Sequence, residues 1–216
     1  MKKCILAILI SSLLWGCKQQ KKQYLPDSVG SINSVTIVMD PQLWGGVVGD
    51  SLRQYFASPV EEIAGAREPL FDIQQIPEDV FQGMTRAGRN ILVVSTDHKN
   101  RFHIKDSLYA KGQKVAFLTG QTTDDLISEI QQYAPVIILS FKENEMREVE
   151  NRFKQTLNKT KAIEERLGIQ LTFPSLYHIV KQEGDFFWLE RKVKNGTADI
   201  LIYEMPKGKI CSSDKD

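Results

Sequence analysis

Catalytic and metal-binding motifs are missing from this 216-residue chain. It holds no Gly-x-Ser-x-Gly elbow, no His-Glu-x-x-His sequence and no paired-cysteine zinc pattern. Histidine is scarce. Asp97 with His98 and His103 could gather around a metal ion, but they lack the four-residue spacing of two histidines on one helical turn. We therefore expect no metal site, no cofactor and no catalytic residue that the sequence reveals.

An excess of charge of one sign is also missing, with 28 Lys and Arg residues against 27 Asp and Glu. Loss of Lys2 and Lys3 with a cleaved N-terminal segment leaves 26 against 27, a net charge of −1. Domains that bind nucleic acid usually carry a basic face. The near-neutral chain is therefore expected to have no nucleic-acid partner.

An apolar run of about a dozen residues, 4–15, follows the positive charges of Lys2 and Lys3. A helix of this length spans about 18 Å at 1.5 Å per residue, whereas the hydrocarbon core of a bilayer is about 30 Å thick. The run is therefore too short for a permanent transmembrane helix. It is typical of a secretory signal peptide, here residues 1–16.

The end of that run, Leu14-Trp15-Gly16-Cys17, resembles the lipobox of bacterial lipoproteins, although Trp15 is bulkier than the usual residue. The resemblance implies cleavage before Cys17, a diacylglyceryl group on its sulfur, and membrane lipid as a partner. The alternative is an ordinary secreted protein with a chance cysteine.

A lipidated cysteine and a flexible polar tether would then occupy residues 17–30. Acidic residues often follow the cysteine of Bacteroidota lipoproteins that are exported to the cell surface. None occurs in residues 18–23. By that resemblance, we expect a membrane-anchored lipoprotein of the cell envelope that faces the periplasm.

Few cysteines remain after such processing. Cys4 leaves with the signal peptide and Cys17 carries the lipid, so that Cys211 alone remains and no intramolecular disulfide can form. The fold must therefore rest on its hydrophobic core. Cys211 lies in a polar tail, residues 207–216, where an incidental cysteine is a simpler interpretation than a catalytic thiol.

Hydrophobic periodicity predicts alternating strands and helices in the first part of the domain. Strands are expected at 34–39, 70–76, 90–95, 102–108 and 113–118. The uninterrupted apolar run in 90–95 indicates a central strand that is buried on both faces. Asp40 and Pro41 are a favourable N-cap and first residue for a helix that ends before Pro59. A shorter helix is expected at 77–81.

A long helix is expected over residues 122–158, where apolar residues recur every three or four positions. Pro135 lies inside this pattern, and a proline in a helix interior costs about 3 kcal/mol and kinks the axis. Because the apolar stripe continues beyond it, we predict one kinked helix rather than a domain boundary. The glutamates and arginines after residue 142 are interpreted as a solvated face.

The C-terminal part is rich in strand signals. A helix at 161–167, capped by Gly168, precedes strands expected at 169–173, 177–182, 186–193 and 198–203. Glu183-Gly184-Asp185 is a hairpin signal. Strands that lie both beside helices and in series indicate an α+β, or mixed α/β, domain over residues 31–206.

Three segments, residues 44–53, 68–73 and 89–92, together resemble a Bacteroidota lipoprotein family catalogued as domain of unknown function 4837. The resemblance covers roughly residues 25–205. It implies no activity, and no catalytic residue transfers from it. Members of the family continue past the strand that ends near Met205, so the tail of this chain is open to three interpretations: a frameshift, a truncation or a genuine short form.

The strand expected at 186–193 supports a truncation, because Phe186-Phe187-Trp188-Leu189 is apolar on both strand faces. A strand of this kind is usually covered on both sides. If the natural partner segment is missing, one face is exposed and the protein is prone to aggregate. We hypothesise that the chain is incomplete.

A glycine-rich stretch, residues 45–49, follows the first strand. It could hold a phosphate at a helix N-terminus, but it matches neither G-x-G-x-x-G nor a P-loop. The simpler interpretation is that the glycines let the helix approach the sheet closely. Trp44 could stack on a ligand or pack in the core, so Trp44, Gly45 and Gly46 form a candidate ligand site beside a structural alternative.

These features together favour a non-enzymatic envelope lipoprotein, a binding or interaction module whose partner is another envelope protein. Two alternatives stay open. One is an envelope hydrolase that uses dispersed residues, and the other is a small-ligand-binding lipoprotein with its site near Trp44.

Overall fold

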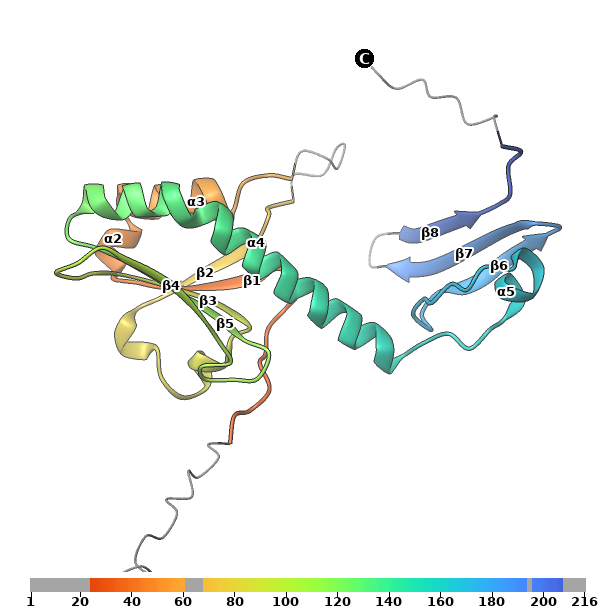
Figure 1. Cartoon of the computed structure of the whole chain (residues 1–216), viewed down its shortest axis with the longest axis horizontal. Helices are drawn as coiled ribbons and strands as arrows, with labels where there is room; N and C mark the ends of the chain where they lie inside the picture. The colour runs from red at the N-terminus through yellow and green to blue at the C-terminus, as the bar shows by residue number, and fades with distance from the viewer. Residues whose placement is uncertain (1–23, 61–67, 194–195, 208–216) are drawn as a thin grey trace, which may run out of the picture.

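The computed structural model describes residues 24–60, 68–193 and 196–207 (Figure 1). The predicted signal peptide, the lipidation site Cys17 and Cys211 lie outside the described residues and stay predictions. No helix within the described ranges has the length and apolar character needed to cross a membrane.

A five-stranded sheet occupies the first part of the chain, in the order β2-β1-β3-β5-β4. Its strands are β1 (Ser34–Val38), β2 (Asp72–Ile76), β3 (Asn90–Thr96), β4 (Arg101–Asp106) and β5 (Lys114–Gly120). All run parallel except β4, which is antiparallel to β5. The predicted central strand is confirmed, because β3 lies in the middle with Ile91, Leu92 and Val94 fully buried.

Helices cover one face of this sheet, as Figure 1 shows. They are α2 (Pro41–Trp44), α3 (Val47–Phe56) and the first half of α4 (Thr123–Gln155). Phe56, Phe71 and Phe141 are fully buried in the core between these helices and the sheet. The short 3-10 helices η1 (Glu78–Val80) and η2 (Gly83–Ala87) lie across the opposite face, where Phe81 packs in a second cluster.

The single helix expected after Asp40 is two helices. Asp40 is the predicted N-cap, since one carboxylate oxygen accepts from the backbone N–H groups of Gln42 at 2.7 Å and Leu43 at 3.3 Å. The chain then leaves helical geometry at Gly46, which is extended and begins α3. Glycine has a low helix propensity, so the break falls where the helix propensity of the sequence is lowest.

The long helix α4 runs without interruption through Pro135. Proline cannot donate to the carbonyl of Gln131, four residues earlier. Both residues are exposed, so water can satisfy that carbonyl. At the start of α4, Thr122 and Asp125 form a capping box.

A second sheet of three antiparallel strands, in the order β6-β7-β8, forms the C-terminal part. The elements here are α5 (Ala162–Leu167), β6 (His178–Glu183), β7 (Phe186–Val193) and β8 (Gly196–Ile202). Gly168 caps α5 in the left-handed region at φ 67°, as predicted. Gly184 has φ 58° in the hairpin between β6 and β7.

The prediction of a strand at 169–173 is wrong, because the structure has no strand there. This segment joins no strand ladder, and the N–H of Asn158 donates to the carbonyl of Phe173. Phe173 packs with Ile163 in a cluster beneath the second sheet. Burial therefore explains Phe173 alone, because Ile169 and Leu171 are exposed.

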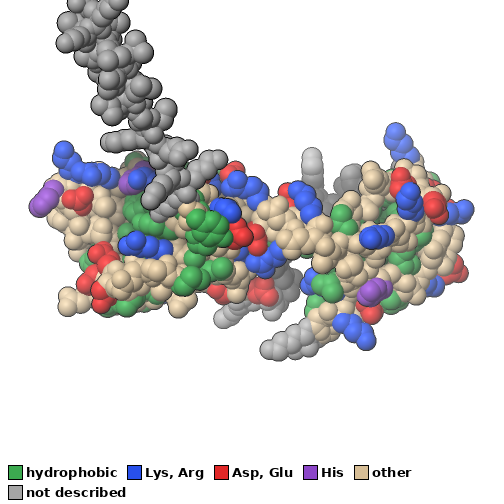
Figure 2. Space-filling view, turned by 90° about the horizontal axis from the view of Figure 1, so that it is seen from below, with side chains coloured by type: hydrophobic (Ala, Val, Ile, Leu, Met, Phe, Trp, Pro, Cys, Tyr) green, Lys and Arg blue, Asp and Glu red, His purple; other side chains and the backbone are tan. Residues whose placement is uncertain are grey.

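One face of the second sheet is covered and the other is open. Phe187 and Leu189 are fully buried in the cluster beneath the sheet, whereas Phe186 and Trp188, on the other face, are half-buried. The apolar clusters of the two sheets share no residue, and Figure 2 shows two lobes joined by a narrow neck. The α+β class is confirmed, while the predicted domain boundaries stay predictions.

Candidate functional site

The carboxyl ends of three parallel strands meet at one edge of the first sheet. The connection after β1 runs along the helical face, and the connection after β2 runs along the opposite face. In open α/β sheets, neighbouring strands whose connections diverge in this way leave a crevice between them, where ligands commonly bind.

A crevice of about 830 Å³ lies at this position. Its walls come from the end of β1 and the start of α2, from the turn after β2, and from the end of β3. The lining residues are Asp40, Pro41, Gln42, Leu43, Pro77, Glu78, Asp79, Ser95 and Thr96. Segments that lie more than 50 residues apart in the sequence thus meet at a single hollow.

The lining of the crevice is acidic and rich in hydroxyl groups. Asp40, Glu78 and Asp79 are exposed carboxylates, and Ser95 and Thr96 supply hydroxyls. None of the lining residues is Lys, Arg or His. The arrangement favours a polar ligand with a positive charge and hydrogen-bond donors.

The predicted ligand residues Trp44, Gly45 and Gly46 stand beside the crevice, but they do not line it. Trp44 packs partly against the main core, and the guanidinium of Arg53 lies 4.5 Å from its ring centroid. Arg53 also donates to the Trp44 carbonyl at 3.3 Å. The cation therefore occupies the position where a ligand would stack on the ring.

The glycine-rich stretch allows α2 and α3 to pack closely against each other. A Cβ atom on Gly49 would overlap the carbonyl group of Trp44, so only glycine lets α3 approach α2 this closely. The sequence-based interpretation placed this close approach at the sheet. The structure places it at the end of α2.

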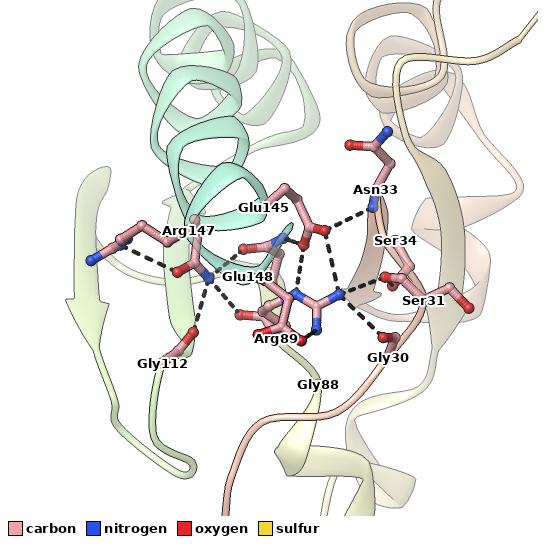
Figure 3. A network of polar contacts seen from close by, with 12 residues as sticks. Gly30, Ser31, Asn33, Ser34, Gly88, Arg89, Gly112, Glu145, Arg147 and Glu148 are labelled. Atoms are coloured by element: carbon pink, nitrogen blue, oxygen red, sulfur yellow. Dashed lines mark hydrogen bonds and ion pairs between the residues drawn. The ribbon is translucent and has the colours of Figure 1, made fainter. Parts of the chain in front are cut away.

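A buried polar network lies at the opposite, amino end of the sheet (Figure 3). Arg89, which precedes β3, and Glu145 on α4 are 3% and 2% exposed. The Glu145 carboxylate accepts from Arg89 Nε at 2.8 Å and from the backbone N–H of Asn33 at 2.8 Å. Arg89 Nη2 donates to the carbonyl of Ser31 at 2.7 Å.

The Arg89–Glu145 pair fastens α4 to the sheet. Asn144, beside Glu145 on the helix, donates to Asn90 Oδ1 and to the carbonyl of Gly112, both at 3.0 Å. The interpretation of Glu145 as part of a solvated helix face is wrong, because its side chain is buried and pairs with Arg89, which lies in a distant segment of the chain. Glu145 lies four residues after Phe141, which itself lies four after Ile137, and this spacing was the available signal that Glu145 shares their buried side of the helix.

The histidines lie apart from the crevice lining. His103 on β4 stacks on Phe117 at 4.7 Å between ring centroids. Partial burial, with Lys105 and Arg101 nearby, lowers the pKa of His103 below its usual range. Among the described residues, no three His, Cys, Asp or Glu side chains gather closely enough to hold a metal ion.

Two family models match the chain. Residues 28–154 match the model described as Domain of unknown function (DUF8532), and residues 156–215 match the model described as Domain of unknown function (DUF4837). No curated protein and no solved structure matches it. The predicted resemblance to family 4837 is confirmed for the C-terminal part, whereas the three segments that suggested it lie within residues 28–154.

Proposed function

Because the chain belongs over residues 28–154 to the family described as Domain of unknown function (DUF8532), which names no activity, we propose a function from the sequence and the geometry. The protein is a membrane-anchored, periplasm-facing envelope lipoprotein that acts as a binding module. Its crevice at the carboxyl ends of β1, β2 and β3 holds a small polar ligand.

The N-terminal sequence supports the anchor. Lys2 and Lys3, the apolar run and the Leu14-Trp15-Gly16-Cys17 sequence occur in the order that a lipoprotein signal requires. A diacylated cysteine supplies the two chains that stable anchoring needs. The polar residues after Cys17 would then separate the folded part from the membrane surface.

The crevice at the point where the strand connections diverge is the single observation that carries the binding role. Its volume of about 830 Å³ suits a small molecule. Ser95 and Thr96 have no histidine or lysine among the lining residues to activate their hydroxyls. The lining therefore favours binding over nucleophilic catalysis.

Thr96→Arg tests this site, because Thr96 is exposed at the end of β3 and a long cationic side chain would fill the crevice. We expect the wild-type chain to bind an amine-bearing probe more tightly than its uncharged counterpart, comparing glucosamine with glucose and ethanolamine with ethylene glycol. Chemical shifts of crevice amides would report binding. The variant should weaken it at least tenfold.

Gln132→Arg is the matched control, since it places the same side chain at an exposed position on α4. The control should bind the probes as the wild type does. Equal binding by wild type and Thr96→Arg, or shifts confined to residues far from the crevice, would reject the proposed site.

A further inference from the structure

Strand β8 forms an open edge of the second sheet. It pairs with β7 on one side, and no other described strand pairs with it on the other. A free edge presents a row of unpaired backbone N–H and C=O groups, which can pair with another strand.

The opposite edge, β6, carries features that discourage such pairing. Its register shifts between Ile179 and Lys181, which marks a bulge or irregularity. Lys181 also forms an exposed ion pair with Glu183 at 2.9 Å. Bulges and charged residues, lysine above all, are the usual means by which proteins protect an edge strand.

Strand β8 lacks these protections. Its residues are Gly196–Ile202, with Asp199 as the one charged residue, and its pairing with β7 keeps one register throughout. Leu201, on the open face beside Trp188, is 56% exposed. The two edges of this small sheet therefore differ, and β8 is the edge that can pair with another strand.

We propose that β8 pairs antiparallel with β8 of a second copy of this chain, which joins the two three-stranded sheets into one of six strands. The pairing places Ile200 opposite Ile200 of the second copy and Asp199 opposite Leu201 of the second copy. Such an arrangement has the two-fold symmetry of most homodimers.

Strand geometry and charge select this register. Residues directly opposite one another point to the same face, so a symmetric pairing keeps the face of the partly buried Ile200 and Ile202 continuous across both copies. A register centred on Asp199 would pair the full strand, but it would set that carboxylate against its own copy. Registers centred on Ile200 and on Ala198 pair equal lengths of β8 and both avoid this repulsion, but only centring on Ile200 sets the apolar Ile200 side chains of the two copies opposite each other.

The register predicts an effect that depends on the sign of an introduced charge. Leu201→Asp would place a carboxylate opposite Asp199 of the second copy, whereas Leu201→Lys would place a cation there. We expect the secreted Cys17→Ser chain to be a dimer by sedimentation velocity. In that background, Leu201→Asp should raise the dimer dissociation constant about tenfold, and Leu201→Lys should leave it unchanged or lower it.

Val180→Asp is the matched control, because Val180 is 49% exposed on β6, at the protected edge. It should leave the dimer intact. A monomer over the whole concentration range would overturn the proposal, and so would equal weakening by both charges at Leu201 or by Val180→Asp. The last two results would indicate general apolar association through the open face.

A disulfide experiment checks the register without relying on affinity. The pairing sets Thr197 opposite Tyr203 of the second copy, and Cα atoms of directly opposite residues lie about 4.5 to 5.5 Å apart, within disulfide range. In a background whose native cysteines are serine, a mixture of Thr197→Cys and Tyr203→Cys chains should crosslink. Each variant alone should crosslink poorly, and equal crosslinking with and without mixing would overturn the register.

Discussion

Thr122 and Asp125 stabilise the start of α4 through reciprocal hydrogen bonds. The Asp125 backbone N–H donates to Thr122 Oγ1 at 3.1 Å, and the Asp125 carboxylate accepts from the Thr122 N–H at 3.0 Å and from its hydroxyl at 2.9 Å. The hydrogen bond from the Thr122 side chain is the main reason that the pKa of Asp125 lies below its ordinary value. The ionised form is thus the one that the fold prefers.

Asp125→Asn should therefore lower stability in a pH-dependent way. The carboxylate stabilises the fold fully above the unfolded pKa of 3.8 and loses this effect as the pH falls through the lowered folded value. Urea unfolding should show a less stable variant at pH 7 and a much smaller difference at pH 3. Asp124→Asn, at the neighbouring position, is the control, and an equal difference at both pH values would contradict the prediction.

At the scale of elements, α4 is attached to the sheet by apolar packing along its first half and by a polar network at its middle. Leu126, Ile130, Ala134, Ile137 and Phe141 are buried in the main core. Beyond Glu145 no residue of α4 is buried. The Arg89–Glu145 pair thus lies at the last buried position of α4. Figure 1 shows that α4 runs on beyond the first sheet.

Glu145→Gln should destabilise the first sheet by about 3 kcal/mol, because it leaves the buried Arg89 guanidinium with only the Glu148 carboxylate, 3.6 Å from Nη1. The free energy of unfolding from urea titration measures this loss. Glu143→Gln, an exposed position on the same helix, should change stability by less than about 0.5 kcal/mol. A loss at Glu145 no larger than at this control would show that the pair is not what holds α4.

At the scale of the whole molecule, the two sheets differ in how they are covered. The first sheet has apolar clusters on both faces. The second has a cluster on one face. Lysine and arginine are interspersed with aspartate and glutamate over both lobes in Figure 2, which agrees with the near-neutral net charge.

The proposed anchor predicts where the whole protein is found. Replacing Cys17 with serine removes the thiol that would carry the lipid, so the chain should move from the membrane fraction to the soluble periplasmic fraction. Metabolic labelling with a radioactive fatty acid should mark the wild type alone. A wild-type chain that is soluble and unlabelled would contradict the anchor.

Local signals in the sequence were enough to predict most elements. Period-two and period-three-or-four patterns identified the strands of the first sheet and the long helix, and Asp40, Thr122 and Gly168 marked helix ends. Capping and periodicity depend on residues a few positions apart. They are therefore readable without knowledge of the fold.

The sequence by itself determined the α+β class, the helix caps and the expectation of an exported, lipidated chain, because each depends on neighbouring residues. Only the tertiary structure decided that Glu145 is buried, since its cation lies 56 positions away. It also decided that the crevice forms beside Trp44, and that Phe173 packs in a cluster although residues 169–173 form no strand. Those outcomes depend on which distant segments meet, and local patterns carry no information about that.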